Sequence, residues 1–177
     1  MRLFIAIEIP EEVKDYIGKI QENIGNKGKI RLVNKGQIHL TLKFLGEVQP
    51  DKAEKVKEEL KKIKFKPFSV YLDSAGVFPS ESYIRVVWIG LKPENNILEL
   101  QSSIDEKLKG LFEKEKDFKA HVTLARVKLI EDKKRFVEQL KKIKVEHKKF
   151  NVDSFKLVKS TLSPKGPVYE DLGIFGK

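Results

Sequence analysis

The chain has 177 residues, 40% of them hydrophobic, which is enough for one well-cored domain, and it contains no cysteine, which excludes disulfides, thiolate nucleophiles and cysteine-bound zinc. Its net charge of +10 and pI near 9.5 favour an anionic partner, for which nucleic acid is the usual candidate. A lysine-rich surface that only keeps the protein in solution, or a hot habitat that enriches charged residues to 35% of the chain, explains the same numbers equally well.

The first ten residues, MRLFIAIEIP, form a short apolar run that Glu8 interrupts and Pro10 ends. A signal peptide requires a longer apolar run with a small-residue cleavage site. A membrane span requires about 18 consecutive apolar residues, which no stretch of this chain approaches. We therefore expect a first β-strand here, in a cytoplasmic protein that does not enter a membrane.

Pro10 and Glu11 suit the start of a helix, because the first helical amides need no partner and the helix dipole favours an acidic side chain. Apolar residues follow at helical spacing, at Val13, Tyr16, Ile17 and Ile20. The same arrangement returns later, because residues 85–94 align with residues 2–11 at a distance of 83 positions. A second apolar stripe follows there, at Ile97, Leu100, Ile104 and Leu108.

Next comes a histidine motif that also occurs twice, as HLTLKFL and as HVTLARV. Alternation along a strand places His39 and Thr41 on one face and the two leucines that follow them on the other. The second copy repeats this pattern with His121 and Thr123, 82 residues later. Each strand is therefore expected to bury its aliphatic side chains and to present an imidazole beside a hydroxyl group.

A second amphipathic helix is predicted after each motif, marked by Ala53, Val56, Leu60 and Ile63 in the first copy and by Phe136, Leu140 and Ile143 in the second. Short apolar strands follow at residues 68–70 and 150–152. Each half thus has the order strand, helix, histidine strand, helix, strand. We predict one α+β domain over residues 1–177, with an internal repeat of roughly residues 1–82 and 83–177 and pseudo-twofold symmetry.

For a single motif, the wet face of a sheet is the simpler explanation. Two copies at duplicated positions favour a shared cleft, because a twofold axis brings equivalent residues together. Two imidazoles in one cleft suit general acid and general base catalysis near neutral pH, and the threonine hydroxyls can donate to an anionic oxygen. Lys43 and Arg126 can add positive charge, so phosphoryl chemistry is the best match. His147 lies among charged residues without such a motif and is predicted to be a surface histidine.

A metal site is the competing interpretation of clustered histidines. Catalytic zinc normally takes three protein ligands. The chain offers two paired histidines, no cysteine and no carboxylate within either motif. We therefore expect neither a metal nor another cofactor.

Six strings follow one another along almost the whole chain: RLFIAI at 2–7, HLTLKFLG at 39–46, GVFP at 76–79, RVVWIG at 85–90, HVTLAR at 121–126 and LSPKGPVY at 162–169. In this order they resemble the two-histidine phosphoesterase superfamily, and within it the bacterial and archaeal RNA 2′,3′-cyclic phosphodiesterases, historically called 2′-5′ RNA ligases. The resemblance implies a bilobal fold in which two antiparallel β-sheets, with helices outside, line a basic central cleft. It also implies hydrolysis of a terminal 2′,3′-cyclic phosphate on RNA, tRNA fragments included, to a 2′-phosphomonoester, and reversible 2′-5′ ligation without ATP.

The expected site consists of the catalytic residues His39 and His121 and the substrate-binding residues Thr41, Thr123, Arg126 and Phe44. On the basis of the resemblance, His39 protonates the leaving 3′-oxygen and His121 acts on the attacking water, and the exchanged assignment stays open. The threonines hold phosphate oxygens and Arg126 adds charge, unless it pairs with a surface acid instead. Phe44 stacks on a base, unless it is a buried core aromatic.

Two alternatives keep the predicted fold and change the function. The first is a basic module that binds RNA ends without catalysis. The second is a phosphodiesterase that acts on small cyclic nucleotides or on 2′-5′ oligonucleotides. A monomer is expected in each case, because the internal repeat already supplies the symmetric cleft that a homodimer otherwise forms.

Overall fold

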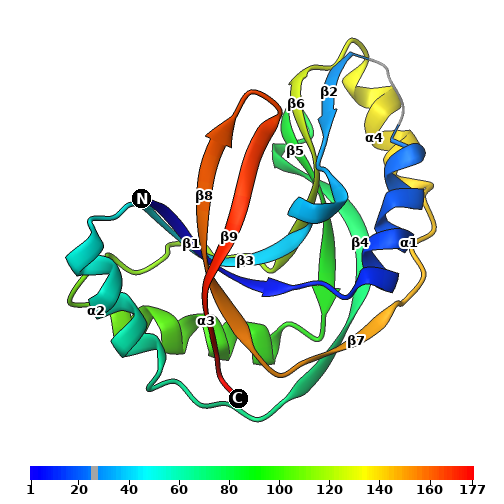
Figure 1. The fold of residues 1–177 in the computed structure, drawn as a ribbon. Coiled ribbons are helices and arrows are strands. Elements are labelled where there is room, and N and C mark those ends of the chain that lie inside the picture. The colour runs from blue at the N-terminus through cyan, green and yellow to red at the C-terminus, as the bar shows by residue number, and fades with distance from the viewer. Residues whose placement is uncertain (25–27) are drawn as a thin grey trace.

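Nine strands form one antiparallel β-sheet in this computed structural model, which describes residues 1–24 and 28–177 (Figure 1). Along the chain they are β1 (Arg2–Glu8), β2 (Lys29–Leu32), β3 (His39–Glu47), β4 (Phe68–Ser80), β5 (Tyr83–Lys92), β6 (His121–Leu129), β7 (Lys149–Val152), β8 (Phe155–Ser163) and β9 (Gly166–Phe175). The helices of this described part lie outside the sheet and are α1 (Glu11–Glu22), α2 (Pro50–Leu60), α3 (Asn95–Leu108), α4 (Lys133–Lys141) and the short 3-10 helix η1 (Lys35–Gln37).

The α-helices form where the sequence predicts them. Pro10 precedes α1, whose first turn is acidic, and Pro50 is the first residue of α2. The Asp132 side chain caps α4 by accepting a hydrogen bond from the backbone amide of Arg135 (3.0 Å). Every residue of the four predicted apolar stripes belongs to the core or packs against it. None of the helices in the described ranges is long and apolar enough to span a membrane.

The order of the strands shows that the sheet curls round on itself. It runs β7-β4-β5-β6-β3-β1-β8-β9, with β2 added beside β6. β7 and β8 lie near opposite ends of this order, yet only residues 153 and 154 separate them in the chain. The two ends of the sheet must therefore approach each other, and the main core fills the space between the curled sheet and the helices.

The prediction of two sheets is wrong, because strands from both halves of the chain join into one sheet. β3 and β6, the two histidine strands, pair at Leu40 and Val122. The halves also exchange strands, since β1 pairs with β8 and β4 pairs with β5. Sequence periodicity identifies the strands, but the pairing of their backbone N–H and C=O groups is decided by the tertiary fold.

Equivalent positions of the two histidine regions lie 82 residues apart in the sheet register. Ala6 is opposite the threonine of the first motif, and Trp88 is opposite the threonine of the second. The sequence alignment matched Arg2 with Arg85 and is therefore shifted by one residue within these two strands. The extra residue of the second copy lies between Trp88 and Pro93, where the two copies realign at 83.

Each histidine strand contains a β-bulge directly after its motif. Residues 42–43 of β3 are both buried, and so are residues 124–125 of β6, at the points where the register with β1 and β5 shifts. Strict alternation puts a side chain five positions after a histidine on the opposite face. The extra residue reverses this, so Phe44 and Arg126 lie on the same face as the histidines.

Lys43 does not add charge to the histidine face, which corrects the expectation drawn from the sequence. The bulge turns its side chain inward, where it is only 3% exposed. Its ammonium donates to the Asp105 carboxylate (2.6 Å) and to the backbone carbonyl of Glu113 (2.7 Å). Burial raises the pKa of Asp105, but the hydrogen bonds from Lys43, Gln101 and the Glu115 amide outweigh it and hold that pKa below its usual value. This network fastens α3 and the segment after it to β3.

Asp105→Ala is expected to destabilise the protein by about 3–5 kcal/mol, because it leaves the buried ammonium of Lys43 without its carboxylate. The double change Lys43→Met with Asp105→Leu removes both charges and is expected to lose much less. Denaturant unfolding measures the free energy of each variant. Glu99→Ala, an exposed change on the same helix, is the control. A double variant as unstable as Asp105→Ala contradicts this account.

Candidate active site

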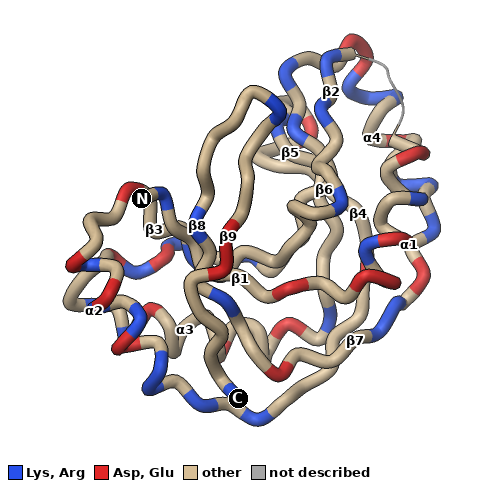
Figure 2. The backbone as a smooth tube through the Cα atoms, in the orientation of Figure 1, with Lys and Arg blue, Asp and Glu red and all other residues tan. Residues whose placement is uncertain are grey.

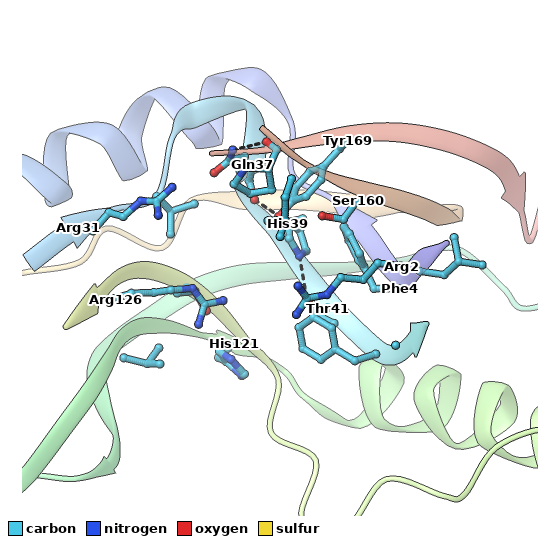
Figure 3. Close-up of a pocket in the computed structure, with 18 of the residues that line it drawn as sticks. Arg2, Phe4, Arg31, Gln37, His39, Thr41, His121, Arg126, Ser160 and Tyr169 are labelled. Atoms are coloured by element: carbon cyan, nitrogen blue, oxygen red, sulfur yellow. Dashed lines mark hydrogen bonds between the residues drawn. The ribbon is translucent and has the colours of Figure 1, made fainter. Parts of the chain in front are cut away.

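A cleft of about 590 Å³ opens on the histidine face of the sheet (Figure 3). Its lining includes all six residues predicted for the site: His39, Thr41, Phe44, His121, Thr123 and Arg126. β3 and β6 supply three of these residues each, at matching positions of the two motifs. Two strands that are far apart in the sequence therefore converge on one cleft, as the repeated motif predicts.

The ring of His39 is held at both nitrogens. Nδ1 lies 2.6 Å from the backbone carbonyl oxygen of Gln37, so this nitrogen carries the proton and donates it to the carbonyl. Nε2 lies 2.7 Å from the hydroxyl oxygen of Thr41, which donates to the neutral ring (Figure 3). Nε2 is therefore the nitrogen that can exchange a proton with a molecule bound in the cleft.

His121 is oriented in the same way. Its Nδ1 lies 2.7 Å from the backbone carbonyl oxygen of Lys119 and donates to it. In both cases the carbonyl belongs to the residue two positions before the histidine, so the extended segment that leads into each strand fixes the tautomer. Figure 3 shows the rings of His39 and His121 bordering the same space. The cleft thus presents two imidazoles, each free to react at Nε2.

Aromatic side chains that the sequence did not assign to the site surround both histidines. Phe4 stacks on the His39 ring with 4.8 Å between the centroids, and the edge of Tyr169 approaches the same ring at 5.6 Å. Phe78 places its edge against His121 at 5.0 Å. All three occur in the strings that resemble the family, but the apolar pattern of β1 does not distinguish Phe4 from its core neighbours.

The environment of the cleft lowers the pKa of both histidines. Burial lowers the pKa of His39 to about 4, against the raising effect of the Gln37 carbonyl, and the positive charges of Lys14 and Arg126 lower it further. Burial also lowers the pKa of His121, which the Lys119 carbonyl opposes and Arg126 reinforces. The free site therefore holds neutral imidazoles, and it is positively charged through its arginines rather than its histidines.

Three arginines line the cleft, and the sequence identified only Arg126. Arg2 comes from the first strand and Arg31 from β2. Within residues 1–24 and 28–177, none of the three forms an ion pair, so the alternative of Arg126 bound to a surface acid does not apply. Phe44 is 66% exposed, which rules out the core alternative for this ring. An exposed ring beside free guanidinium groups suits a nucleotide, whose base stacks while its phosphate binds cations.

His147 lies outside the cleft, as predicted. Its side chain is 64% exposed, 3.9 Å from the Asp73 carboxylate, and its ring lies 4.6 Å from that of Tyr71. It makes none of the contacts that orient His39 and His121.

The family model of the LigT-like phosphoesterases matches the chain twice, over residues 7–88 and 89–169. The chain belongs to this family. One relative, the RNA 2′,3′-cyclic phosphodiesterase of Methanocaldococcus jannaschii, is 46% identical over 96% of this chain and 97% of its own. A protein of the same name from Archaeoglobus fulgidus is 37% identical over 99% of both chains. The resemblance seen in the sequence is thus confirmed at the level of the family.

Solved structures of similar proteins share the fold over nearly their full length. The Thermus thermophilus protein TT0787 superposes with a TM-score of 0.83 at 30% identity and covers 99% of this chain and 97% of that one. Escherichia coli LigT complexed with 3′-AMP superposes with a TM-score of 0.79 at 25% identity, over 98% and 96% of the two chains. In that LigT protein the same fold accommodates a nucleotide.

In this LigT-like phosphoesterase, His39 is expected to titrate near pH 4 when the cleft is free, and so to remain neutral as the pH falls from 6.5 towards 5. Inorganic phosphate adds negative charge beside the ring and is expected to raise its pKa. The chemical shifts of the histidine ring protons, followed by NMR against pH with and without phosphate, measure both values. His39→Gln and His121→Gln variants assign the resonances. Titration of His39 near pH 6.5 in the free protein contradicts the expectation.

Proposed function

We propose that the protein is an RNA 2′,3′-cyclic phosphodiesterase that opens a terminal cyclic phosphate to a 2′-phosphomonoester without a metal or other cofactor. The observation that carries the proposal is the convergence of His39 and His121 on one cleft, each with Nδ1 bound to a carbonyl and Nε2 left to react. Relatives of 46% and 37% identity that bear this activity in their names match almost the whole chain. The net charge of +10 suits a polyanionic substrate.

Opening of the ring requires a base on one side of phosphorus and an acid on the other. His121 takes a proton from a water molecule at Nε2 while the water oxygen bonds to phosphorus. The bond from phosphorus to the ribose 3′-oxygen breaks, and His39 donates a proton from Nε2 to that oxygen. The 2′-oxygen keeps its bond, which gives the 2′-phosphomonoester. Exchange of protons with solvent then returns both rings to their starting states.

The neighbouring side chains complete this scheme. Thr41 and Thr123 donate hydrogen bonds to the non-bridging phosphate oxygens, and Arg126 balances the charge of the transition state. The anionic phosphate also raises the pKa of His39, so that this ring can hold the proton that it delivers. Phe44 stacks on the terminal base. The two motifs are so alike that exchanged roles for the histidines satisfy the same geometry.

The same geometry supports reversible 2′-5′ ligation. When a 5′-hydroxyl of a second RNA takes the place of water, its oxygen bonds to phosphorus, the 3′-oxygen leaves, and a 2′-5′ linkage results. The cyclic ester supplies the activated bond, so no ATP is required. RNA ends that carry a cyclic phosphate, those of tRNA fragments included, are the substrates of both reactions.

We also propose that residues 1–177 form a single domain whose two lobes derive from a repeat of roughly 1–82 and 83–177, and that it works as a cytoplasmic monomer. The shared register of 82 residues and the double match of the family model support the repeat. The monomer follows from the cleft, because one chain supplies both histidines.

His39→Ala and His121→Ala are each expected to lower turnover by about 10²- to 10⁴-fold, because each removes a general acid or base. The assay uses a short RNA with a 2′,3′-cyclic phosphate end and contains EDTA, and the product is tested for 2′- against 3′-phosphate. His147→Ala, on the outer surface, is the control and is expected to keep its activity. Full activity of either cleft variant overturns the acid–base pair.

The outcomes of this assay separate the alternatives. A 2′-phosphate formed in EDTA supports the proposed reaction, its regiochemistry and its independence of metal. A 3′-phosphate retains the histidine pair but reverses which ribose oxygen leaves. An absence of product together with tight, salt-sensitive RNA binding identifies the non-catalytic binding module instead.

A further inference from the structure

Two arginines of the cleft lie directly opposite each other on neighbouring strands. Arg31 of β2 and Arg126 of β6 are register partners in the antiparallel pairing. Like charges in directly opposed positions destabilise a sheet. Neither guanidinium has a carboxylate partner within the described ranges, and both line the cleft. A bound anion removes this repulsion, so the pair has the chemistry of a phosphate site.

The two members of the pair lie at different depths. Arg126 is close enough to the centre that its charge lowers the pKa of both catalytic histidines. Arg31 extends the site outward along β2, towards the turn between β8 and β9. A side chain at Gly166 in this turn would approach the Arg31 guanidinium to 2.9 Å, and Gly166 has φ +111°. The guanidinium therefore lies against a turn that has no side chain at this point.

We propose that Arg31, together with Arg126, binds the phosphodiester group on the 5′ side of the terminal nucleotide. The preferred substrate is then an RNA of at least two nucleotides rather than a cyclic mononucleotide. This inference rests on the proposed function, because the terminal cyclic phosphate must lie between the two histidines. It adds a residue to the site, a second phosphate to the substrate and a direction to the RNA chain.

The covalent structure of RNA gives the direction. The base is attached at C1′ and the 5′ chain at C4′, on opposite sides of the two carbons that carry the cyclic phosphate. When the base stacks on Phe44, the 5′ chain points away from Phe44. Figure 3 shows Arg31 and Arg126 on one side of the two histidines, and Arg2 and Phe4 on the other. The preceding phosphate therefore reaches the Arg31 side.

The surface beyond Arg31 fits a continuing RNA chain. Figure 2 shows basic residues on β2 and at the turn between β8 and β9, whereas acidic residues gather on the helices. Leu32 and Leu162 line the same end of the cleft and are 42% and 72% exposed. Such apolar rims suit the faces of unpaired bases. Charge and apolar surface thus alternate along one exit path.

Arg2 is the rival for the second phosphate. It also lines the cleft, on the side of Phe4 and Phe44, and it has no ion-pair partner in the described ranges. It lacks an opposed arginine, since its sheet partners are Glu47 and Ser160. If the base and the 5′ chain occupy the reverse positions, Arg2 replaces Arg31 in the role proposed here.

The test compares two substrates, adenosine 2′,3′-cyclic phosphate and the dinucleotide ApA with a 2′,3′-cyclic phosphate end. Arg31→Gln is expected to lower the ratio of kcat/KM for the dinucleotide over the mononucleotide by about 10- to 100-fold, the loss of a charged hydrogen bond. A third substrate carries a neutral methylphosphonate in place of the internal phosphate. The wild type is expected to lose a similar factor on this substrate, and Arg31→Gln to show no further loss.

Arg135→Gln, an exposed change on α4 with the same loss of charge, is the control and is expected to keep the wild-type ratio. An unchanged ratio in Arg31→Gln, or a methylphosphonate penalty as large in this variant as in the wild type, overturns the inference. A selective loss in Arg2→Gln instead of Arg31→Gln also overturns it and reverses the direction of the chain.

A binding measurement separates this inference from the proposed function. Calorimetry compares the dinucleotide that ends in a 2′-phosphate with its internal methylphosphonate analogue. The wild type is expected to bind the charged dinucleotide about 10- to 100-fold more tightly, and Arg31→Gln to bind both equally. This result stands even when no substrate turns over, in which case the proposed hydrolysis fails alone. Equal binding of both dinucleotides by the wild type overturns the second phosphate site.

Discussion

The composition of the cleft depends on one extra residue in each histidine strand. A strand that alternated without interruption would turn Phe44 and Arg126 into the core and leave the histidines with only their threonines. The bulges at residues 42–43 and 124–125 shift the alternation, so three side chains of each strand reach one surface. The same bulges give the core a lysine in one strand and an alanine in the other. Lys43 then requires the buried carboxylate of Asp105, and that pair holds α3 against β3.

The site accepts unfavourable electrostatics in its empty state. Three arginines without carboxylate partners in the described ranges border two half-buried imidazoles, and their charge and burial hold the rings neutral. The stability that this arrangement forgoes is supplied by the continuous core beneath the sheet. An anionic substrate reverses the balance, because it neutralises the arginines and favours protonation of the imidazoles. The cleft is thus complementary to a phosphate in both its charge and its response to charge.

Much of the fold and the reactive pair was predictable from sequence, because periodicity and repetition are local signals. The strands at residues 2–8 and 39–47, all four α-helices and the shared cleft of His39 and His121 follow from such signals. The single curled sheet does not, because edge pairing depends on which backbone groups meet in three dimensions. Lys43 was misplaced because a bulge leaves no mark in an alternating pattern. Arg31 and Phe4 were missed because they belong to the site only through their cross-strand neighbours.

The exchange of strands between the halves bears on how the protein acquires activity. β4 belongs to the first half of the chain but pairs with β5, and β8 belongs to the second half but pairs with β1. The pairing of Leu40 with Val122 spans most of this distance, so it forms only after the second histidine strand has been synthesised. Until then β3 has an open edge and a lone histidine, and no cleft exists. Catalytic competence in this chain is therefore a late event of folding, and a truncated or half-folded molecule cannot act on RNA ends.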